Sequence, residues 1–184
     1  MTTSKLSDIV SPAFYDLHRQ IKAGEVSSVV AKGGRGSTKS SWISIELIVL
    51  LIKSSDCHAV VFRKIGNTLR NSVYAQCVWA IGALGLSSKF HCTVSPMEIV
   101  YKSTGQKIFF LGLDDPAKAK SIKTPFGYIG IAWFEELDQF AGQEEIRNVE
   151  QSVFRGGEKA IEFMSFNPPA MARNWANRYV LEQR

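Results

Sequence analysis

Cysteine and histidine, on which disulfide frameworks and zinc sites depend, are scarce in this sequence. The three cysteines, Cys57, Cys77 and Cys92, are odd in number and form no Cys-x-x-Cys pair. The three histidines are scattered along the chain and show no spacing typical of metal ligands. We therefore expect neither a disulfide-stapled scaffold nor a cysteine-rich zinc centre, and we interpret all six residues as structural.

Long apolar runs are also absent. The N-terminal segment contains no apolar stretch of signal-peptide length, and the most apolar run, Trp42–Ile52, is interrupted by Glu46. A membrane-spanning helix needs about 20 apolar residues, so no segment qualifies. We expect a soluble, cytoplasmic protein that has no membrane partner.

Apolar residues are nevertheless numerous enough to build a core. Hydrophobic residues make up 45% of the 184 and charged residues 21%, which excludes a disordered tail, a collagen-like fibre and a low-complexity linker. The length is that of one ordinary domain. The 22 Lys and Arg exceed the 17 Asp and Glu and give a net charge of +5. This excess suits an anionic partner, but it is far below the charge density of a histone.

The order of the predicted elements indicates an α/β fold. Apolar and β-branched runs predict parallel core strands near residues 28–32, 58–63, 107–112, 128–134 and 160–166. Helical spacing predicts helices over Ser40–Lys53, Asn67–Leu84 and Gln143–Phe154. Phe90–Leu113 alternates as strands do, with a hairpin turn at Ser103–Gln106. Strands that alternate with helices favour a mostly parallel central sheet flanked by helices.

A glycine-rich turn joins the first strand to the first long helix. It reads Gly33-Gly34-Arg35-Gly36-Ser37-Thr38-Lys39-Ser40. Against the P-loop pattern G-x-x-x-x-G-K-[ST], Gly33, Lys39 and Ser40 are in register, and Thr38 stands at the position of the second glycine. The backbone N–H groups of such a turn and the N-terminus of the next helix form an anion cradle. We therefore predict that residues 33–40 bind the phosphates of ATP.

Individual residues of this turn have distinct expected roles. Lys39 can reach the β- and γ-phosphates, and the Ser40 hydroxyl can ligate Mg²⁺. The β-branch of Thr38 disfavours a positive φ, so we expect the loop to adopt another local geometry there. Arg35 can reach the γ-phosphate as a catalytic charge sensor in cis, or it can be an ordinary solvated arginine. The alternative for the whole segment is a plain β–α turn with a solvated lysine.

Two adjacent acids, Glu135 and Glu136, end the apolar run Tyr128–Phe134, as in a Walker B strand. Neighbouring side chains on a strand point to opposite faces, so one carboxylate can face a metal and the other the attacking water. We assign Glu135 to Mg²⁺, through water, and Glu136 to polarising the hydrolytic water. Aspartate is usual at the first position, so the division of roles stays open and Asp138 is an outside candidate. The alternative is that both acids cap the next helix.

A third polar strand end carries Ser165 and Asn167, followed by Pro168 and Pro169. Such residues can sense the γ-phosphate or position a water molecule, and the prolines force the chain to turn. The alternative is a plain strand terminator.

Several other residues have two interpretations each. Phe14 and Tyr15, with the amide of Gln20, can border the adenine or pack on the sheet. Arginines that can reach a neighbouring subunit's nucleotide, or simply lie at the surface, are Arg63, Arg70, Arg155, Arg173 and Arg178. Lys118, Lys120 and Lys123 can contact DNA phosphates or form a solvated face.

Taken together, these segments resemble the ATPase domain of the tailed-phage terminase large subunit, the DNA-packaging motor. The similar segments follow the family's order and are Ser11–Tyr15, residues 33–41 (GGRGSTKSS), 60–64 (VVFRK), 133–140 (WFEELDQF) and 165–169 (SFNPP). The P-loop by itself is widespread. The combination of Phe-Glu-Glu after a strand with a later Ser-Phe-Asn-Pro-Pro is far more specific.

The resemblance implies a P-loop NTPase fold of the additional-strand type, with ATP and Mg²⁺ as ligands and double-stranded DNA as the translocated substrate. It also implies a ring of subunits at the portal of a viral procapsid in the host cytoplasm, with the portal protein and the small terminase subunit as partners. Asn167 and its neighbours match the family's coupling motif, and Arg35 matches its loop arginine.

Residues 1–184 are expected to be the ATPase domain alone, a fragment of a longer chain that lacks the family's C-terminal nuclease. The isolated domain can then be a monomer. Two alternatives remain open. One is a helicase- or recombinase-type P-loop ATPase that depends on single-stranded DNA. The other is a nucleotide-gated assembly module with little turnover of its own, because an arginine from a neighbouring subunit is missing.

Overall fold

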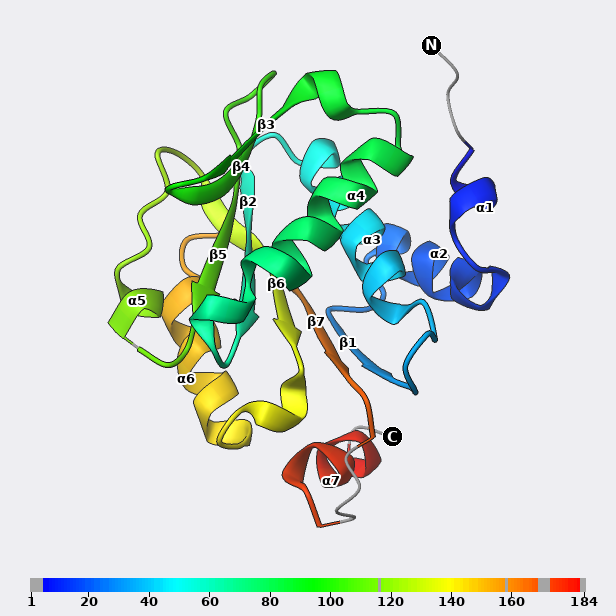
Figure 1. Ribbon diagram of the computed structural model, residues 1–184, viewed down its shortest axis with the longest axis vertical. Coiled ribbons are helices and arrows are strands. Elements are labelled where there is room, and N and C mark those ends of the chain that lie inside the picture. The colour runs from blue at the N-terminus through cyan, green and yellow to red at the C-terminus, as the bar shows by residue number, and fades with distance from the viewer. Residues whose placement is uncertain (1–4, 116, 158, 169–172, 183–184) are drawn as a thin grey trace.

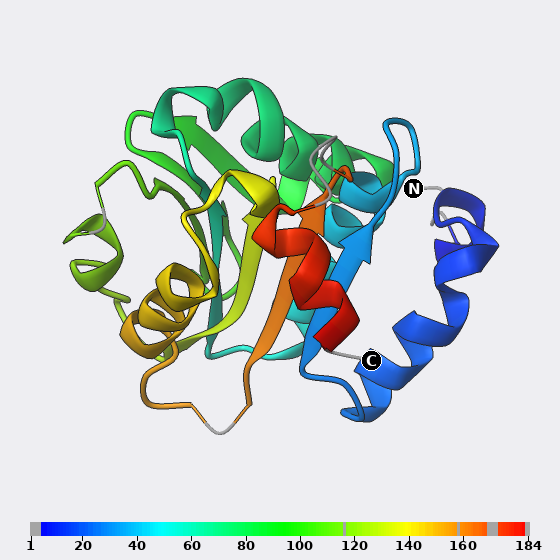
Figure 2. The ribbon, with the colours of Figure 1, turned by 90° about the horizontal axis from the view of Figure 1, so that it is seen from below.

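A seven-stranded sheet between two layers of helices forms the body of the protein in the computed structural model (Figure 1). The structure describes residues 5–115, 117–157, 159–168 and 173–182. Helices α3 and α4 cover one face of the sheet, and α6 and α7 cover the other (Figure 2). The N-terminal helices α1 and α2 lie beside α3, next to the β1 edge of the sheet (Figure 1).

The strand order is β1-β7-β6-β2-β5-β4-β3. The strands are β1 Ser28–Lys32, β2 Cys57–Arg63, β3 Phe90–Val94, β4 Met97–Tyr101, β5 Lys107–Gly112, β6 Tyr128–Glu135 and β7 Ile161–Phe166. Five of them, β1, β7, β6, β2 and β5, pair in parallel, which confirms the predicted parallel core. The last two pair antiparallel, and the predicted hairpin turn lies between β4 and β5.

Strand β7 is inserted between β1 and β6, which gives the additional-strand arrangement that was expected. Lys32 is in register with Phe166, and Glu135 is in register with Ser165. Because the strands are parallel, their carboxyl ends meet at one edge of the sheet. Ligands bind at this edge in open α/β sheets.

The helices are α1 Leu6–Ile9, α2 Tyr15–Ala23, α3 Lys39–Lys53, α4 Ala75–Ala83, α5 Ala117–Lys120, α6 Gln143–Val153 and α7 Trp175–Glu182. Short 3-10 turns span Pro12–Phe14, Gly66–Thr68, Ser87–Lys89 and Leu137–Gln139. The helices predicted over Ser40–Lys53 and Gln143–Phe154 are confirmed as α3 and α6. Among the residues described, no helix is both long and apolar enough to cross a membrane.

The helix predicted over Asn67–Leu84 is only partly correct. Its first part is a 3-10 turn followed by a π-helical turn, Arg70–Tyr74, and the α-helix begins at Ala75. Thr68 donates its hydroxyl hydrogen to the Ile65 carbonyl at 2.6 Å, and Ser72 donates to the Thr68 carbonyl at 2.7 Å. Such side chain–backbone bonds compete with regular helical pairing.

The two faces of the sheet bury separate apolar clusters. The cluster under α3 and α4 includes Ile45, Trp133 and Phe163. The cluster under α6 includes Phe134 and Met164. Adjacent residues of β6 therefore face opposite layers, as strand geometry requires. Helix α3 is apolar almost all round because both the sheet and its helical neighbours cover it.

Aromatic stacking attaches the N-terminal segment to α3. The rings of Phe14 and Trp42 are parallel within 4° and their centroids are 4.6 Å apart. Nearby, Nδ1 of His18 lies 2.7 Å from a carboxylate oxygen of Glu46, which is buried on α3. The Tyr15 hydroxyl donates to the Ser7 carbonyl at 3.0 Å. Of the two interpretations of Phe14, packing is therefore the one that the contacts support.

The expectation for the backbone of Thr38 is wrong. Thr38 adopts the left-handed conformation, with φ 59° and ψ 8°, that a glycine would take at this position of the loop. The Thr38 carbonyl accepts the first hydrogen bond of α3, from the Trp42 amide at 2.9 Å, and its hydroxyl donates to the Ser37 carbonyl. The loop geometry therefore overrides the preference of a β-branched residue, at a cost on the order of 1–3 kcal/mol.

Replacing Thr38 with glycine is expected to stabilise the protein. Glycine adopts this conformation without a Cβ clash, although it adds conformational entropy to the unfolded chain. We expect Thr38→Gly to raise the free energy of unfolding by about 1 kcal/mol in denaturant titrations. Thr38→Ser, which keeps the Cβ atom and the hydroxyl, is the matched control and should change stability less. A less stable Thr38→Gly variant would contradict the strain at this position.

His58 is a structural residue of β2, as predicted. It is fully buried, its Nε2 donates to the Phe126 carbonyl at 2.8 Å, and its Nδ1 accepts from the Lys107 amide at 2.9 Å. Both nitrogens are thus used by the neutral ring. Burial lowers the pKa of His58 below its ordinary value.

Stability should therefore fall in mild acid. Below the unfolded-state pKa of about 6.5, the unfolded chain binds a proton that the buried ring does not accept. The free energy of unfolding should then decrease as the pH falls from about 7.5 towards 5, by up to about 1.4 kcal/mol per pH unit. His58→Gln should flatten this slope, and His91→Gln, at an exposed position on β3, should keep it. Urea titrations at several pH values measure the slopes, and equal slopes in all three proteins would refute the assignment.

Candidate phosphate-binding site

The glycine-rich loop lies between β1 and α3 at the carboxyl edge of the sheet. The Gly33 amide donates to the Phe166 carbonyl at 3.3 Å, which ties the start of the loop to the end of β7. A Cβ atom on Gly33 would lie only 3.0 Å from the Ser37 hydroxyl, so the tight turn requires glycine there. A cavity of about 340 Å³ opens at this point, lined by residues 35–41 and by Asn167.

Lys39 is the first residue of α3, and its ammonium group folds back into the loop. Nζ donates to the Gly33 carbonyl and the Ser37 hydroxyl, each at 2.8 Å, and to Oδ1 of Asn167 at 3.1 Å. Partial burial lowers the pKa of Lys39, and the charge of Glu135 opposes this shift. The lysine thus lies where the loop, the N-terminus of α3 and the end of β7 meet.

The two residues predicted to hold Mg²⁺ are brought together. The Ser40 hydroxyl donates to Oε1 of Glu135 at 3.4 Å, across 95 positions of sequence. Burial raises the pKa of the Glu135 carboxyl, and the neighbouring Arg63 guanidinium lowers it. A hydroxyl and a carboxylate are hard oxygen donors of the kind that Mg²⁺ prefers, so this pair fits the ion. Elsewhere among the described residues, no group of three or more His, Cys, Asp or Glu side chains is arranged to hold a metal.

Glu136 follows Glu135 at a sharp bend of the backbone. Its φ of 57° and ψ of 54° are left-handed, and its side chain is 52% exposed. Non-glycine residues in this conformation are concentrated at functional sites. Asp138, the outside candidate, lies in the following turn, where its carboxylate accepts from the Gln139 amide at 3.0 Å.

Arg63 does not have the setting expected of an arginine that reaches another subunit. It is the last residue of β2, 9% exposed, with Nε 2.8 Å from Oε2 of Glu135 and Nη2 paired with Oε2 of Glu136. The guanidinium is therefore committed to this chain's own acids. The sequence motifs did not predict this contact because it depends on β2 lying next to β6, which no local pattern specifies.

The third strand end is brought to the site only in part. The Asn167 amide reaches Lys39, whereas Ser165 is buried within the sheet and its hydroxyl accepts from the Trp133 indole at 2.9 Å. A buried indole N–H needs such an acceptor. The contacts of Ser165 thus support a structural role, and the phosphate-sensing role assigned to it has no support in them. Pro169 lies outside the described residues.

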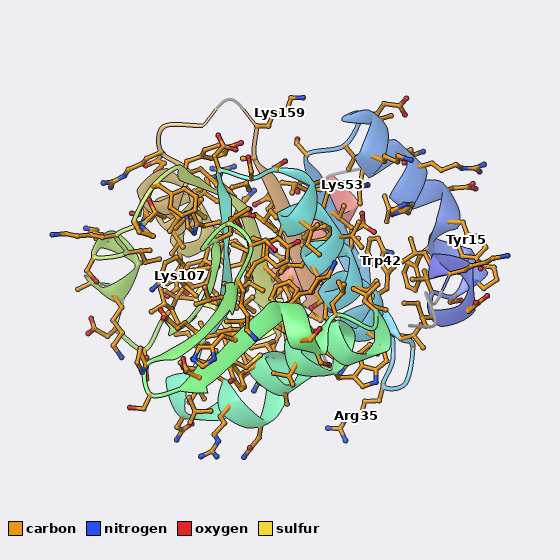
Figure 3. All side chains as sticks on the ribbon, turned by 90° about the horizontal axis from the view of Figure 1, so that it is seen from above. Tyr15, Arg35, Trp42, Lys53, Lys107 and Lys159 are labelled. Carbon is orange, nitrogen blue, oxygen red and sulfur yellow. The ribbon has the colours of Figure 1, made fainter. Side chains whose placement is uncertain are left out.

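The remaining charged candidates are exposed. Arg35 projects from the loop away from the body of the protein (Figure 3). Four further arginines, Arg70, Arg155, Arg173 and Arg178, also lie at the surface. Of the three lysines, Lys118 lies 3.9 Å from a carboxylate oxygen of Asp114, and Lys120 and Lys123 face solvent. Their roles stay predictions.

Comparison of sequences identifies relatives along almost the whole chain. The family model described as "Phage terminase large subunit" matches residues 26–184. The large terminase subunit of Bacillus phage SPP1 is 36% identical over 182 residues, which are 97% of this chain and 43% of that protein. The PBSX phage terminase large subunit of Bacillus subtilis (strain 168) is 29% identical over 149 residues, 80% of this chain and 32% of the relative. The chain thus spans less than half the length of these relatives.

Solved structures share the fold at low sequence identity. The large terminase of bacteriophage HK97 has a TM-score of 0.69 and 14% identity, and the match covers 94% of this chain and 36% of that one. The N-terminal domain of the DNA packaging ATPase from bacteriophage phi29 has a TM-score of 0.64 and 16% identity, covering 96% and 86%. The large terminase of a thermophilic bacteriophage, in complex with ADP, has a TM-score of 0.65 and 12% identity, covering 87% and 38%.

These matches confirm the P-loop NTPase fold that the loop and the strand order indicate. They also confirm the resemblance seen in the sequence motifs. The family model covers most of the residues, and it includes every element of the candidate site. The chain therefore belongs to the phage terminase large subunit family.

Proposed function

We propose that this chain hydrolyses ATP to drive the translocation of double-stranded DNA into a phage procapsid. The observation that carries the proposal is the convergence of Lys39 and Glu135, joined through Ser40 and Asn167, at one cavity beside the glycine-rich loop. Membership of the family supports the same conclusion. The thermophilic-phage terminase that binds ADP and the phi29 packaging motor share the fold.

Phosphate binding is the task of the loop and of Lys39. The loop amides and the N-terminus of α3 present positive partial charge to the cavity. The Lys39 ammonium, now surrounded by neutral oxygen acceptors, can exchange them for phosphate oxygens, which carry more negative charge. Arg35 is placed at the rim of the same cavity, where it can approach the terminal phosphate in cis.

Ser40 and Glu135 are the residues that would hold Mg²⁺, with Glu135 acting through water. The ion, when bound, supplies positive charge that offsets the charge developing on the phosphate oxygens. Glu136 is the group that orients and polarises the attacking water, because its half-exposed carboxylate lies next to Glu135 at the edge of the cleft. Asn167 contacts Lys39 and precedes the segment that leads to α7, so it is suited to transmit the state of the site.

The partners proposed for the assembled protein come from the family. They are double-stranded DNA, the portal protein, the small terminase subunit and further copies of the chain in a ring, at the procapsid portal in the host cytoplasm. The 184 residues act as the ATPase domain in this proposal, and no nuclease activity is expected of them.

Lys39→Ala is expected to abolish ATP turnover, a loss of about 10²-fold or more, because it removes the only side-chain ammonium placed at the phosphates by the described contacts. The control is Lys53→Ala, at the opposite end of the same helix, which should keep the wild-type rate. Phosphate release measures turnover. Equal rates in wild type and Lys39→Ala would refute the proposed site.

Glu136→Gln is expected to retain ATP binding and to lose hydrolysis. The amide keeps the size of the side chain but cannot polarise the water as a carboxylate does. Binding of a fluorescent ATP analogue and phosphate release separate the two steps. Glu144→Gln, at an exposed position on α6, is the matched control and should behave as wild type. Unchanged turnover in Glu136→Gln would remove the role assigned to it.

The dependence of turnover on DNA and on protein concentration tests the wider proposal. A specific rate that rises with protein concentration is expected if one of the exposed arginines completes a neighbour's site, since such an arginine contributes roughly 10³–10⁵ in rate. Stimulation by duplex DNA is expected for a packaging motor. Stimulation by single-stranded DNA alone would favour a helicase-type ATPase. A rate independent of concentration would count against an arginine supplied in trans.

A further inference from the structure

Arg63 lies beside the two acids of β6 because of strand register. Strands β2 and β6 are parallel neighbours, and Phe62 is paired with Phe134. The next residue on each strand, Arg63 and Glu135, therefore lies at the same carboxyl edge of the sheet. The Arg63 side chain is 10% exposed, so its charge is largely removed from water and requires compensation.

The guanidinium contacts both acids through different nitrogens. Nε is 2.8 Å from Oε2 of Glu135, and Nη2 pairs with Oε2 of Glu136. The other oxygen of Glu135, Oε1, faces the Ser40 hydroxyl. The Glu135 carboxylate is thus shared between the proposed metal side and the arginine, and each oxygen has its own partner.

The backbone at Glu136 explains how one arginine can reach both acids. Consecutive side chains of an extended strand point to opposite faces. The left-handed conformation of Glu136 breaks this alternation, so both carboxylates can turn towards Arg63. Two neighbouring carboxylates repel each other, and the guanidinium, which presents several donors in one plane, compensates both charges.

The next residue of the chain has a different partner. Lys64 Nζ lies 2.6 Å from Oε1 of Glu145 on α6, and Nζ also donates to the Leu113 carbonyl at 3.3 Å. The other cation close to Glu135 is Lys39, which is held by the loop. Among the described residues, the contact with Glu136 is made by Arg63.

We infer that Arg63 is a positioning residue of the ATPase site. It holds Glu135 with one oxygen free for the metal side, and it holds Glu136 in the bent conformation that directs its carboxylate to the attacking water. This inference rests on the proposed function. It replaces the interpretation of Arg63 as an arginine that acts on a neighbouring subunit.

Kinetics of Arg63→Met and Arg63→Lys test the catalytic part. Arg63→Met should lower kcat by about 10²-fold or more and change the KM for ATP less than about threefold, because the arginine acts through the acids and the phosphates are bound by the loop. Arg63→Lys should recover part of kcat, since an ammonium can neutralise one carboxylate but lacks the planar fork. Lys64→Met is the matched control on the adjacent residue and should keep the wild-type kcat.

A stability cycle tests the contact without any use of turnover. In the wild-type background, Glu136→Gln should leave the denaturant midpoint unchanged or lower it, because it weakens an ion pair. In the Arg63→Met background, the same change should raise the midpoint, because it removes repulsion between two uncompensated carboxylates. A purely packing role for Arg63 would give the same sign in both backgrounds. If Arg63→Met does not fold, Arg63→Gln serves in its place.

The outcomes separate this inference from the proposed function. Loss of turnover on Arg63→Met with the sign reversal in stability supports the inference. A KM raised about tenfold or more with kcat unchanged would overturn it, because Arg63 would then contact the nucleotide directly. The same sign in both backgrounds would also overturn it. A wild-type chain without ATPase activity would refute the proposed function, and the stability cycle would still report on the ion pair.

Discussion

The site depends on the position of β7 between β1 and β6. This order sets the glycine-rich loop and the acidic strand end two strands apart at the same edge of the sheet. The N-terminus of α3 spans that interval, so the Ser40 hydroxyl meets Glu135 while Lys39 meets Asn167 at the end of the intervening strand. Parallel pairing is the essential constraint, because it brings all three carboxyl ends to one side.

Opposite charges are matched within this small volume. Lys39 and Arg63 face Glu135 and Glu136, and both cations are partly or largely buried. Burial raises the pKa of Glu135, and the two cations oppose that shift. A buried carboxylate without such partners would be protonated or would destabilise the fold. The same arrangement that keeps the fold stable therefore keeps the acids charged for a metal and a water molecule.

Two non-glycine residues among those described adopt a left-handed backbone, and both lie in the site. Thr38 precedes the first turn of α3, and Glu136 follows the last residue of β6. Each is held by contacts of the surrounding structure, the helix hydrogen bond in one case and the arginine pair in the other. Local strain at such positions is tolerated because the neighbouring elements are rigid and determine the path of the chain.

The sequence by itself determined the strands, the loop and the roles expected of Lys39, Ser40 and the two acids, because these depend on local periodicity and on spacing along the chain. It also predicted the family through short motifs. The tertiary structure decided the partners of Arg63, Ser165 and Phe14, since each depends on which strands or helices are neighbours. It also decided the conformation of Thr38, because the energy of the whole loop outweighs the preference of one residue. Contacts between distant segments arise from strand order and packing, which no local pattern specifies.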